Sequence, residues 1–429
     1  MRAAGVPDAA REAFRDLYEQ LIAGGAAELP GHELEPVGDL RRLEDIDVDV
    51  TDELLDRATI IKLNGGLGTS MGLHGPKSLI EVKRGHTFLD LIVRQVLALR
   101  QRHSARLPLV LMNSFSTQQA TSEAIARYED IEVDVPVELL QNREPKLRAD
   151  DLHPVEWPQD PELEWAPPGH GDIYAALIGS GMLDALLERG YEYAFVSNID
   201  NLGAVLEPRI LGVMARERLP FVMEVAETTE ADRKGGHIAR LKRTGSLVLR
   251  EKAQVPEGDT SFGDFRRWRY FNSNTLWIHL PGLAEQGIPK LPLIVNRKNV
   301  DPADPSTPEV LQLETAMGAA LGSIGGAEAI AVPRSRFAPV KTTNDLLVVR
   351  SDAYALREDD CRLELAPERR QPAPPVVDLD PDHYRLLADF EARFPAGPPS
   401  LVHADRFAVR GDVTFGAGTV ATGTTEISA

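Results

Sequence analysis

The chain has 429 residues, 43% hydrophobic and 26% charged, which is the balance of a globular protein with about two or three domains. Its formal net charge is −19 and no run of Lys and Arg forms a basic patch, so nucleic acid and acidic membrane surfaces are disfavoured as partners. Cys361 is the only cysteine, which excludes an intramolecular disulfide, and we interpret it as a buried free thiol. The N-terminal residues lack a signal-peptide pattern and no apolar run of about 18 residues occurs, so we expect a cytoplasmic protein.

The first predicted element is an amphipathic helix over residues 8–23. Its apolar residues share one face: Phe14, Leu17, Tyr18, Leu21 and Ile22. Asp8 is a candidate N-cap, and Gly24-Gly25 is expected to end the helix.

From residue 59 onward the pattern alternates between strand and helix. Helices are predicted over Phe88–Arg100 and Gln118–Tyr128, and strands over Thr59–Leu63, Leu107–Met112, Val133–Leu140 and Tyr193–Val196. This alternation predicts a mostly parallel, doubly wound sheet. Further strands with hairpin signals such as Thr244-Gly245 predict an added antiparallel layer: Phe221–Thr228, Ile238–Leu241, Leu247–Leu249 and Thr275–Leu280.

The C-terminal residues have a different pattern. The Pro-rich stretch Glu368–Pro381 is interpreted as a linker or extended arm. An apolar residue then recurs at every sixth position, at Val409, Phe415, Ala421 and Ile427. A six-residue period is typical of a parallel β-helix, but little more than one coil is present, so we expect it to lean on the preceding domain or on another subunit.

The most informative segment is the glycine-rich stretch Lys62–Val82, with the sequence KLNGGLGTSMGLHGPKSLIEV. Glycines that directly follow a buried strand let backbone N–H groups approach phosphate oxygens. Pro76 separates Gly75 from Lys77, which excludes a Walker loop, and the spacing of Gly66, Gly68 and Gly72 does not fit the dinucleotide fingerprint of an NAD-dependent oxidoreductase. By itself, the loop indicates nucleotide or phosphate binding.

With these motifs, the chain resembles the eukaryotic-type UTP–glucose-1-phosphate uridylyltransferases. The glycine loop carries this resemblance together with QNREPKL (141–147), PPGHGD (167–172), SNIDNLGA (197–204), KGGHIARL (234–241), FNSNTLWI (271–278) and RFAPVKTTNDLL (336–347). The resemblance implies an α/β nucleotide-diphosphosugar transferase fold, of GT-A or Rossmann-like type, with a mixed sheet. We expect an N-terminal helical segment (1–50), a catalytic domain (51–350) and a C-terminal region (351–429) that ends in a short left-handed β-helical piece.

The same resemblance implies roles for individual residues. UTP is expected to contact Leu63, Gly65, Gly66, Gln141, Gly169 and His170, with the Gln141 amide reading uracil. The sugar phosphate is expected to contact Asn198, Lys234, Gly236, Glu251, Asn272 and Asn274. Thr275 departs from the family pattern, which has a third Asn there. Without the family, Gln141 would be interpreted as a solvated loop residue and His170 as a structural histidine.

For the chemistry, the resemblance points to Lys77 and Lys341 as the groups that stabilise the transferring phosphoryl. Asp200 lies at a predicted strand end and is the candidate ligand for Mg²⁺, although an Asp that caps the next helix fits the sequence equally well. The implied reaction joins UTP and glucose 1-phosphate into UDP-glucose and pyrophosphate.

Two alternatives to this activity remain open from the sequence. One is a pyrophosphorylase for another sugar 1-phosphate, such as that of galactose or N-acetylglucosamine. The other is a non-catalytic regulator that binds UTP or sugar. The sequence also leaves open whether the protein is a monomer or a homo-oligomer.

Overall fold

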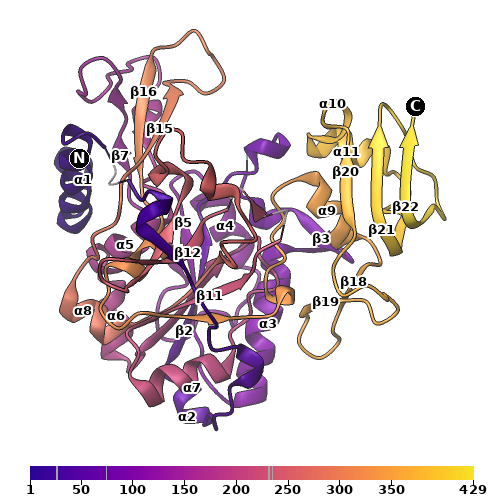
Figure 1. Cartoon of the computed structure of the whole chain (residues 1–429), viewed down its shortest axis with the longest axis horizontal. Coiled ribbons are helices and arrows are strands. Elements are labelled where there is room, and N and C mark those ends of the chain that lie inside the picture. The colour runs from indigo at the N-terminus through magenta and orange to yellow at the C-terminus, as the bar shows by residue number, and fades with distance from the viewer. Residues whose placement is uncertain (26–27, 74, 230–231, 234) are drawn as a thin grey trace.

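A computed structural model describes residues 1–25, 28–73, 75–229, 232–233 and 235–429 (Figure 1). Within these residues a ten-stranded mixed sheet forms the centre of the molecule. Seven strands follow one another across it: β1 (Leu34–Pro36), β12 (His237–Leu241), β14 (Tyr270–His279), β10 (Tyr193–Asn198), β2 (Ala58–Asn64), β5 (Leu109–Asn113) and β6 (Glu138–Leu140). Three more attach to this path: β11 (Phe221–Glu227), β13 (Leu247–Arg250) and β17 (Glu328–Ala331).

The sheet combines the two layers that the sequence predicts. β10, β2, β5 and β6 are parallel neighbours, whereas β14 runs antiparallel to β10, β11 and β12. The mixed α/β architecture is therefore confirmed. The N-terminal segment also contributes to the sheet, because β1 pairs with β12.

Helices cover both faces of the sheet, as the alternation of apolar side chains along each strand requires. Ile60 of β2 packs on the face covered by α3 (Phe88–His103), α7 (Pro208–Glu217) and α9 (Thr343–Arg350). Its neighbour Ile61 packs on the other face, with α5 (Ile173–Gly179), α6 (Met182–Glu188) and α8 (Leu280–Gln286). None of the helices that the structure describes is long and apolar enough to cross a bilayer.

The N-terminal helix α1 (Asp8–Ile22) packs against α5 and near β16 (Glu309–Glu314), which pairs with β15 (Ile294–Asn299) and β8 (Leu147–Arg148). The prediction of Asp8 as its N-cap is wrong, since Pro7 occupies that position and Asp8 is the first helical residue. The helix ends before Gly24 and Gly25, whose φ angles of 112° and 100° suit glycine.

Two predicted strands are shorter than expected. β5 begins at Leu109 and not at Leu107, because Leu107 has a φ of 38° and Pro108 follows it. β6 is limited to Glu138–Leu140, although Val133–Leu140 is apolar enough for a longer strand. Pro136 lies in this stretch and lacks the N–H that a ladder needs. The predicted helix over Gln118–Tyr128 is observed as α4 (Gln118–Ile125).

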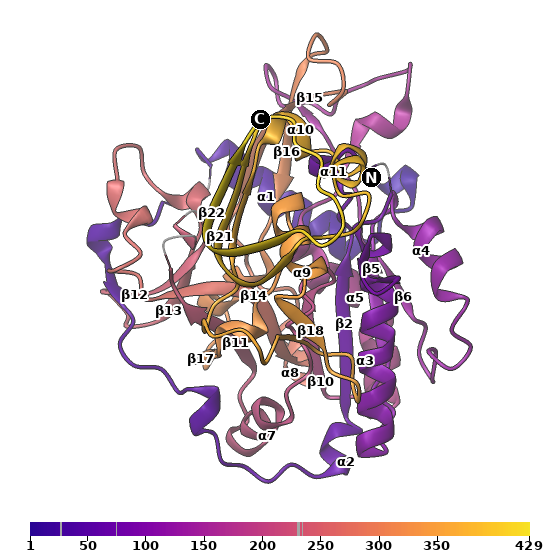
Figure 2. The ribbon, with the colours of Figure 1, turned by 90° about the vertical axis from the view of Figure 1, so that its right-hand side faces the viewer.

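The C-terminal region lies beside the sheet domain, with its last strands at the right of Figure 1 and facing the viewer in Figure 2. It contains the hairpin β18 (Tyr354–Leu356) and β19 (Leu363–Leu365), the helices α10 (Pro381–Tyr384) and α11 (Leu387–Arg393), and the strands β20 (Val376–Leu379), β21 (Ser400–Arg410) and β22 (Val420–Ser428). β20, β21 and β22 pair in parallel. The predicted linker is thus only partly irregular, because β20 forms within it. Of the residues with the six-residue period, Val409, Phe415 and Ala421 are buried and Ile427 is half-buried.

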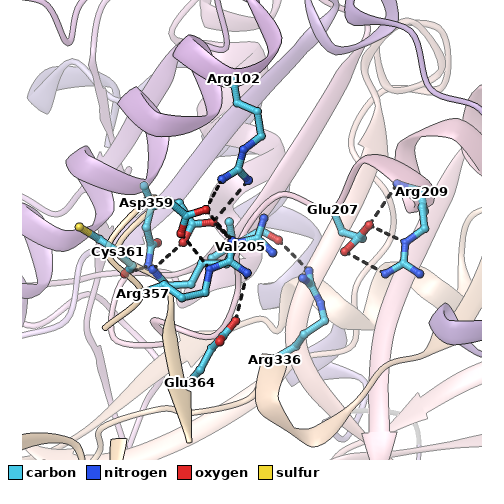
Figure 3. Close-up of polar contacts among 12 residues, drawn as sticks. Arg102, Val205, Glu207, Arg209, Arg336, Arg357, Asp359, Cys361 and Glu364 are labelled. Carbon is cyan, nitrogen blue, oxygen red and sulfur yellow. Dashed lines mark hydrogen bonds and ion pairs between the residues drawn. The ribbon is translucent and has the colours of Figure 1, made fainter. Parts of the chain in front are cut away.

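Polar contacts fasten this region to the sheet domain. Arg102 of α3 pairs with Asp359 at 2.8 Å (Figure 3), and it also pairs with the buried Asp360 at 3.5 Å. Cys361, which follows them in the hairpin turn, is half-buried and not fully buried as expected. On the other side, Lys83 Nζ donates to the backbone carbonyls of Val349, Arg350, Ser351 and Tyr354, at the end of α9.

Candidate active site

The glycine-rich loop leaves the C-terminal end of β2 and folds back on itself. Leu67 forms an antiparallel bridge with Pro76, and the Lys77 N–H donates to the Gly66 carbonyl at 3.3 Å. These contacts return Lys77 to the strand end from which the loop started. A Cβ added at Gly72 would lie 3.0 Å from Leu386 Cδ2, so the loop also contacts the C-terminal region.

Lys77 faces the candidate metal ligand. Its Nζ lies 2.6 Å from Asp200 Oδ2, and each side chain is only 14% exposed. Asp200 follows β10, the parallel neighbour of β2, so the two residues meet at the carboxyl edge of the sheet, where ligands bind in such folds. Asp200 Oδ1 is buried and has no hydrogen-bond partner among the described residues.

The segment that carries Lys341 runs alongside this pair. Asn201 bridges to Pro339, and the Val340 N–H donates to the Asp200 carbonyl at 3.1 Å. Lys341 follows directly, just before α9. Its charge adds to the effect of burial, which lowers the pKa of His170, and opposes the effect of burial on Glu251, which raises the pKa of that residue. Lys341 is therefore close enough to interact electrostatically with both a predicted UTP-binding residue, His170, and a predicted sugar-binding residue, Glu251.

A buried ion pair supports the turn that holds Asp200. Arg336 pairs with Glu224 at 2.7 Å. It also donates to the Val205 carbonyl at 2.8 Å, the contact drawn between these two residues in Figure 3. Below the same turn, Lys62 Nζ donates to the Ala204 carbonyl at 2.7 Å. Burial, with help from the nearby Arg336 charge, lowers the pKa of Lys62 to about 7.

Three predicted UTP-binding residues meet beside the glycine loop. Gln141 Nε2 donates to the Gly169 carbonyl at 2.7 Å, and a Cβ added at Gly65 would lie 2.7 Å from Gln141 Oε1. Leu63 accepts the Ile199 N–H at 3.1 Å, across the same strand ends. A Cβ added at Gly66 would meet no described atom within 4 Å, so its backbone borders open space.

His170 lies in the turn after Gly169 and is held in one tautomer. Its Nδ1 accepts the Met317 N–H at 3.1 Å, so the proton of the neutral ring is on Nε2. Burial, followed by the Lys341 charge, lowers the pKa of His170 to about 4. At neutral pH this histidine is an uncharged hydrogen-bond donor.

The predicted sugar-binding residues form a continuous chain of contacts. Asn274 Nδ2 donates to Asn198 Oδ1 at 3.0 Å, the Asn274 N–H donates to Asn272 Oδ1 at 2.8 Å, and the Asn272 N–H donates to the Gly236 carbonyl at 2.9 Å. Gly236 in turn faces Glu251, since an added Cβ would lie 2.5 Å from Glu251 Oε1. Lys234 is outside the described residues.

Burial raises the pKa of Glu251 to about 7, with the Lys341 charge acting against that rise. Asn274 has a φ of 57°, at a register shift between β11 and β14, and this turns its amide toward Asn198. Thr275, the departure from the family pattern, is buried between Ser197 and Glu224, and its hydroxyl has no partner among the described atoms.

Sequence reasoning did not identify several residues of this site. Ser114 Oγ donates to the Gly65 carbonyl at 3.0 Å, and Arg336 holds the Asp200 turn from below. Ser114 directly follows the buried strand β5, and this position at the carboxyl end of a parallel strand is a sequence feature that predicts a place in the site. Asp172 lies inside the PPGHGD motif and accepts hydrogen bonds from Asn142.

The fit of this site to a metal ion depends on Asp200. No group of three or more His, Cys, Asp or Glu side chains that suits a metal occurs in the part of the chain that the structure describes. Mg²⁺ needs only one or two protein carboxylates when substrate phosphates and water complete its shell. The unpartnered Oδ1 of Asp200 is compatible with that mode of binding.

The fold and the site define an α/β protein with a glycine-rich loop and a lysine–aspartate pair at the carboxyl edge of its mixed sheet. The family model for UTP–glucose-1-phosphate uridylyltransferase matches residues 11–421, and the chain belongs to this family. Relatives of that name include one from Hordeum vulgare, 42% identical over 388 residues (89% of this chain and 80% of the relative). A probable uridylyltransferase from Schizosaccharomyces pombe is 40% identical over 382 residues (88% and 74%).

Solved structures agree with the family assignment. The chain matches UDP-glucose pyrophosphorylase from Leishmania major, known in open and closed structures, with a TM-score of 0.94 and 46% identity, over 100% of this chain and 93% of that one. A point mutant of the Leishmania major protein in complex with UDP-glucose matches with a TM-score of 0.93, 45% identity and the same coverage.

Proposed function

We propose that the protein transfers uridylyl from UTP to glucose 1-phosphate, giving UDP-glucose and pyrophosphate. The observation that carries this proposal is the convergence of three predicted groups at one sheet edge, in a chain that belongs to the uridylyltransferase family. These groups are the loop with Lys77, the Gln141–Gly169 pair and the Asn198–Asn274–Asn272 chain. The relatives are named for this activity, and one matching structure holds UDP-glucose.

The proposed reaction is an in-line attack of a sugar-phosphate oxygen on the α-phosphorus of UTP. A phosphate monoester loses its second proton at about pH 6, so the nucleophile is already ionised at neutral pH and needs no general base. This agrees with a neutral His170, which serves as a donor and not as a base. The difficulty lies in bringing two anions together, and positioned cations and N–H groups address it.

We assign that electrostatic task to Lys77, Lys341 and the N–H groups of the glycine loop. Asp200 balances the Lys77 charge within the fold, and a substrate phosphate would compete with Asp200 for the ammonium group. Asp200, with the phosphates of UTP, would hold Mg²⁺, which supplies further neutralisation of phosphate charge when it is bound. Gln141 would pair with the uracil edge through its amide, which offers both an acceptor and donors.

For the sugar, we propose that the amides of Asn198, Asn272 and Asn274 contact the hydroxyls and that Glu251 contributes an acceptor. Side chains of this kind distinguish hydroxyl positions because each amide presents fixed donors and acceptors. We also interpret the sheet core as a GT-A-like domain and the parallel strands β20–β22 as the start of a left-handed β-helix.

The test is pyrophosphate release with UTP, Mg²⁺ and a panel of sugar 1-phosphates. Release with glucose 1-phosphate at the highest kcat/KM is the expected result. A preference for galactose 1-phosphate or N-acetylglucosamine 1-phosphate would replace the sugar assignment and keep the chemistry. UTP binding without release from any sugar would contradict catalysis and favour a regulatory protein.

A further inference from the structure

The two loops that carry Gln141 and Gly169 come from separate parts of the chain. Gln141 continues β6, since its N–H donates to the Asn113 carbonyl at 2.7 Å. Gly169 lies in the turn that leads into α5, with a φ of 76°. The strands β7 (Glu144–Pro145) and β9 (Trp165–Ala166) pair farther along these loops, and next to Gly169 the Gln141 amide joins them through Nε2 and the Gly169 carbonyl. In the proposed function that amide also faces a uracil ring, so a further contact beside it would hold the amide in place.

Asp172 supplies that further contact. Its Oδ2 accepts the Asn142 N–H at 2.7 Å, and its Oδ1 accepts from Asn142 Nδ2 at 2.9 Å. The same Nδ2 lies 3.2 Å from Oδ2. Asp172 is itself part of the Gly169 turn, because its N–H donates to the Gly169 carbonyl at 3.3 Å. Asp172 is 5% exposed, so little water competes with Asn142 for its carboxylate.

We propose that Asp172 is a positioning residue for uracil recognition: its carboxylate binds Asn142 and thereby holds the neighbouring Gln141 amide against the Gly169 turn. This inference rests on the proposed function, in which Gln141 and Gly169 contact the base. Asp172 touches neither substrate nor the reacting atoms in this scheme. Its removal should weaken UTP binding and leave the chemical step nearly unchanged.

The contact between Asp172 and Asn142 should also depend on pH. Burial raises the pKa of Asp172 to about 7, and the hydrogen bonds from Asn142 act against that rise. A cavity of about 1030 Å³ is lined by both Asn142 and Asp172, which gives water a route to the carboxyl group. Protonation removes one of the acceptor sites that Asn142 needs. The KM for UTP should therefore rise as pH falls through 7.

Other ionisable groups surround this contact and define the controls. Glu144 is buried nearby, and burial with the charges of Asp172 and Glu314 raises its pKa well above the usual range. His170, two residues before Asp172, is neutral above about pH 4. Besides Glu144 and Asp172, the charged residues that line the cavity are Glu12, Asp16, Glu19, Arg143 and Lys290. Arg143 also contacts the segment before Gly169, through Trp165 and Glu162, whereas Asp172 binds Asn142 itself.

The experiment compares steady-state kinetics of the whole enzyme and its D172N, N142A, Q141A and E144Q variants from pH 6 to 8.5. We expect D172N to raise the KM for UTP about 10-fold at pH 8 and to change kcat less than about 3-fold, the scale of a lost charge-assisted contact. N142A, which leaves the carboxylate in place, should raise the KM for UTP in the same direction. E144Q is the matched control, a buried carboxyl changed to an amide, and should retain the wild-type KM.

The pH dependence of the KM for UTP distinguishes a positioning role of Asp172 from a general loss of structure in its variants. The phosphates of UTP titrate at about pH 6 in every variant, so the profile of D172N is the baseline. The wild-type enzyme should show an additional rise in KM below pH 7 that D172N lacks. If D172N does not fold, the KM for UTP of N142A tests the proposal in its place.

Two outcomes would overturn the inference. One is a wild-type KM for UTP in both D172N and N142A, and the other is a loss in kcat with KM unchanged. Q141A distinguishes failure of this inference from failure of the site assignment. A raised KM in Q141A alone would reject only the role of Asp172. An unchanged KM in Q141A as well would reject the uracil-reading site itself.

Discussion

Lys77 Nζ and Asp200 Oδ2 lie 2.6 Å apart at the carboxyl edge of the sheet, with both side chains 14% exposed. One partner comes from the loop after β2 and the other from the turn after β10, so this ion pair joins the segments that follow two paired parallel strands. The fold thus holds its loop lysine next to an internal counter-ion. Substrate phosphate has to offer the ammonium group a better partner than this carboxylate.

Removal of either proposed catalytic cation should slow turnover. We expect K77A and K341A each to lower kcat by about 10²–10³-fold, the usual effect of losing one positioned donor to a developing charge. Lys242 provides the control, because it is an exposed lysine in the turn between β12 and β13. K242A should retain wild-type kcat. A K77A or K341A enzyme with near-normal kcat and a normal thermal midpoint would remove that lysine from the mechanism.

Gly169 should tolerate no side chain. Its φ is 76°, and an added Cβ would lie 2.7 Å from the Thr315 carbonyl oxygen, a backbone atom that cannot move aside easily. Gly181 has a nearly identical φ of 79°, but no described atom lies within 4 Å of its added Cβ. Both G169A and G181A incur about 1 kcal/mol of backbone strain.

Only G169A adds the clash, so it should lose clearly more stability and also raise the KM for UTP. Urea unfolding and UTP kinetics on the two variants provide the measurement. Equal losses of stability, with normal UTP kinetics in both, would contradict the observed packing of the Gly169 turn.

Asn274 allows the side chain and the backbone to be tested separately. Its φ of 57° is unfavourable for alanine and easy for glycine, while both replacements remove the amide that contacts Asn198. N274G and N274A should raise the KM for glucose 1-phosphate to a similar extent. N274A should in addition be less stable than N274G by about 1 kcal/mol. Unchanged sugar kinetics in both would remove Asn274 from the sugar site.

His237 should contribute to acid sensitivity. It is buried against Trp268, with ring centroids 4.6 Å apart, and burial together with the charges of Arg250 and Arg267 lowers its pKa to about 3. Since the unfolded chain binds a proton at about pH 6.5 and the folded state does not, this residue costs stability as pH falls below 6.5.

The loss attributable to His237 between pH 7 and pH 5 is about 2 kcal/mol. H237F removes the titrating group and keeps an aromatic ring. Between pH 7 and pH 5, the free energy of unfolding of H237F should therefore decrease by about 2 kcal/mol less than that of the wild-type protein. Asp172 and Glu251 have raised pKa values and act in the opposite sense. Asp172 and Glu251 are present in both the wild-type protein and H237F, so their contribution cancels in the comparison. Parallel pH profiles would show that His237 is protonated normally in the fold.

Much of the framework was predictable because local sequence decides it. The apolar run after Ala58 predicts β2, and the period of Phe88–Arg100 predicts α3, since burial of one face follows directly from spacing. The lengths of β5 and β6 were not predicted, because Pro108 and Pro136 limit pairing only once the partner strand is known.

Within the site, the family motifs predict which residues bind the substrates but not how these residues contact one another. The Asn274–Asn198 contact depends on a positive φ at a register shift between two strands, which no local pattern encodes. The Lys77–Asp200 pair joins residues 123 positions apart in the chain, and the Asn142–Asp172 pair joins residues 30 apart. Such contacts follow from sheet order, and the order of ten strands cannot be read from periodicity.

The close approach of Gly72 to Leu386 limits which sequence changes, and which chimeras between relatives, this protein can accept. An added Cβ at residue 72 would lie 3.0 Å from Leu386 Cδ2, so the sizes of the two residues constrain each other. A chimera that takes residues 351–429 from one relative and the glycine loop from another would join surfaces shaped for different neighbours. These two segments are therefore expected to be inherited as a matched set, although 314 positions separate residue 72 from residue 386 in the sequence.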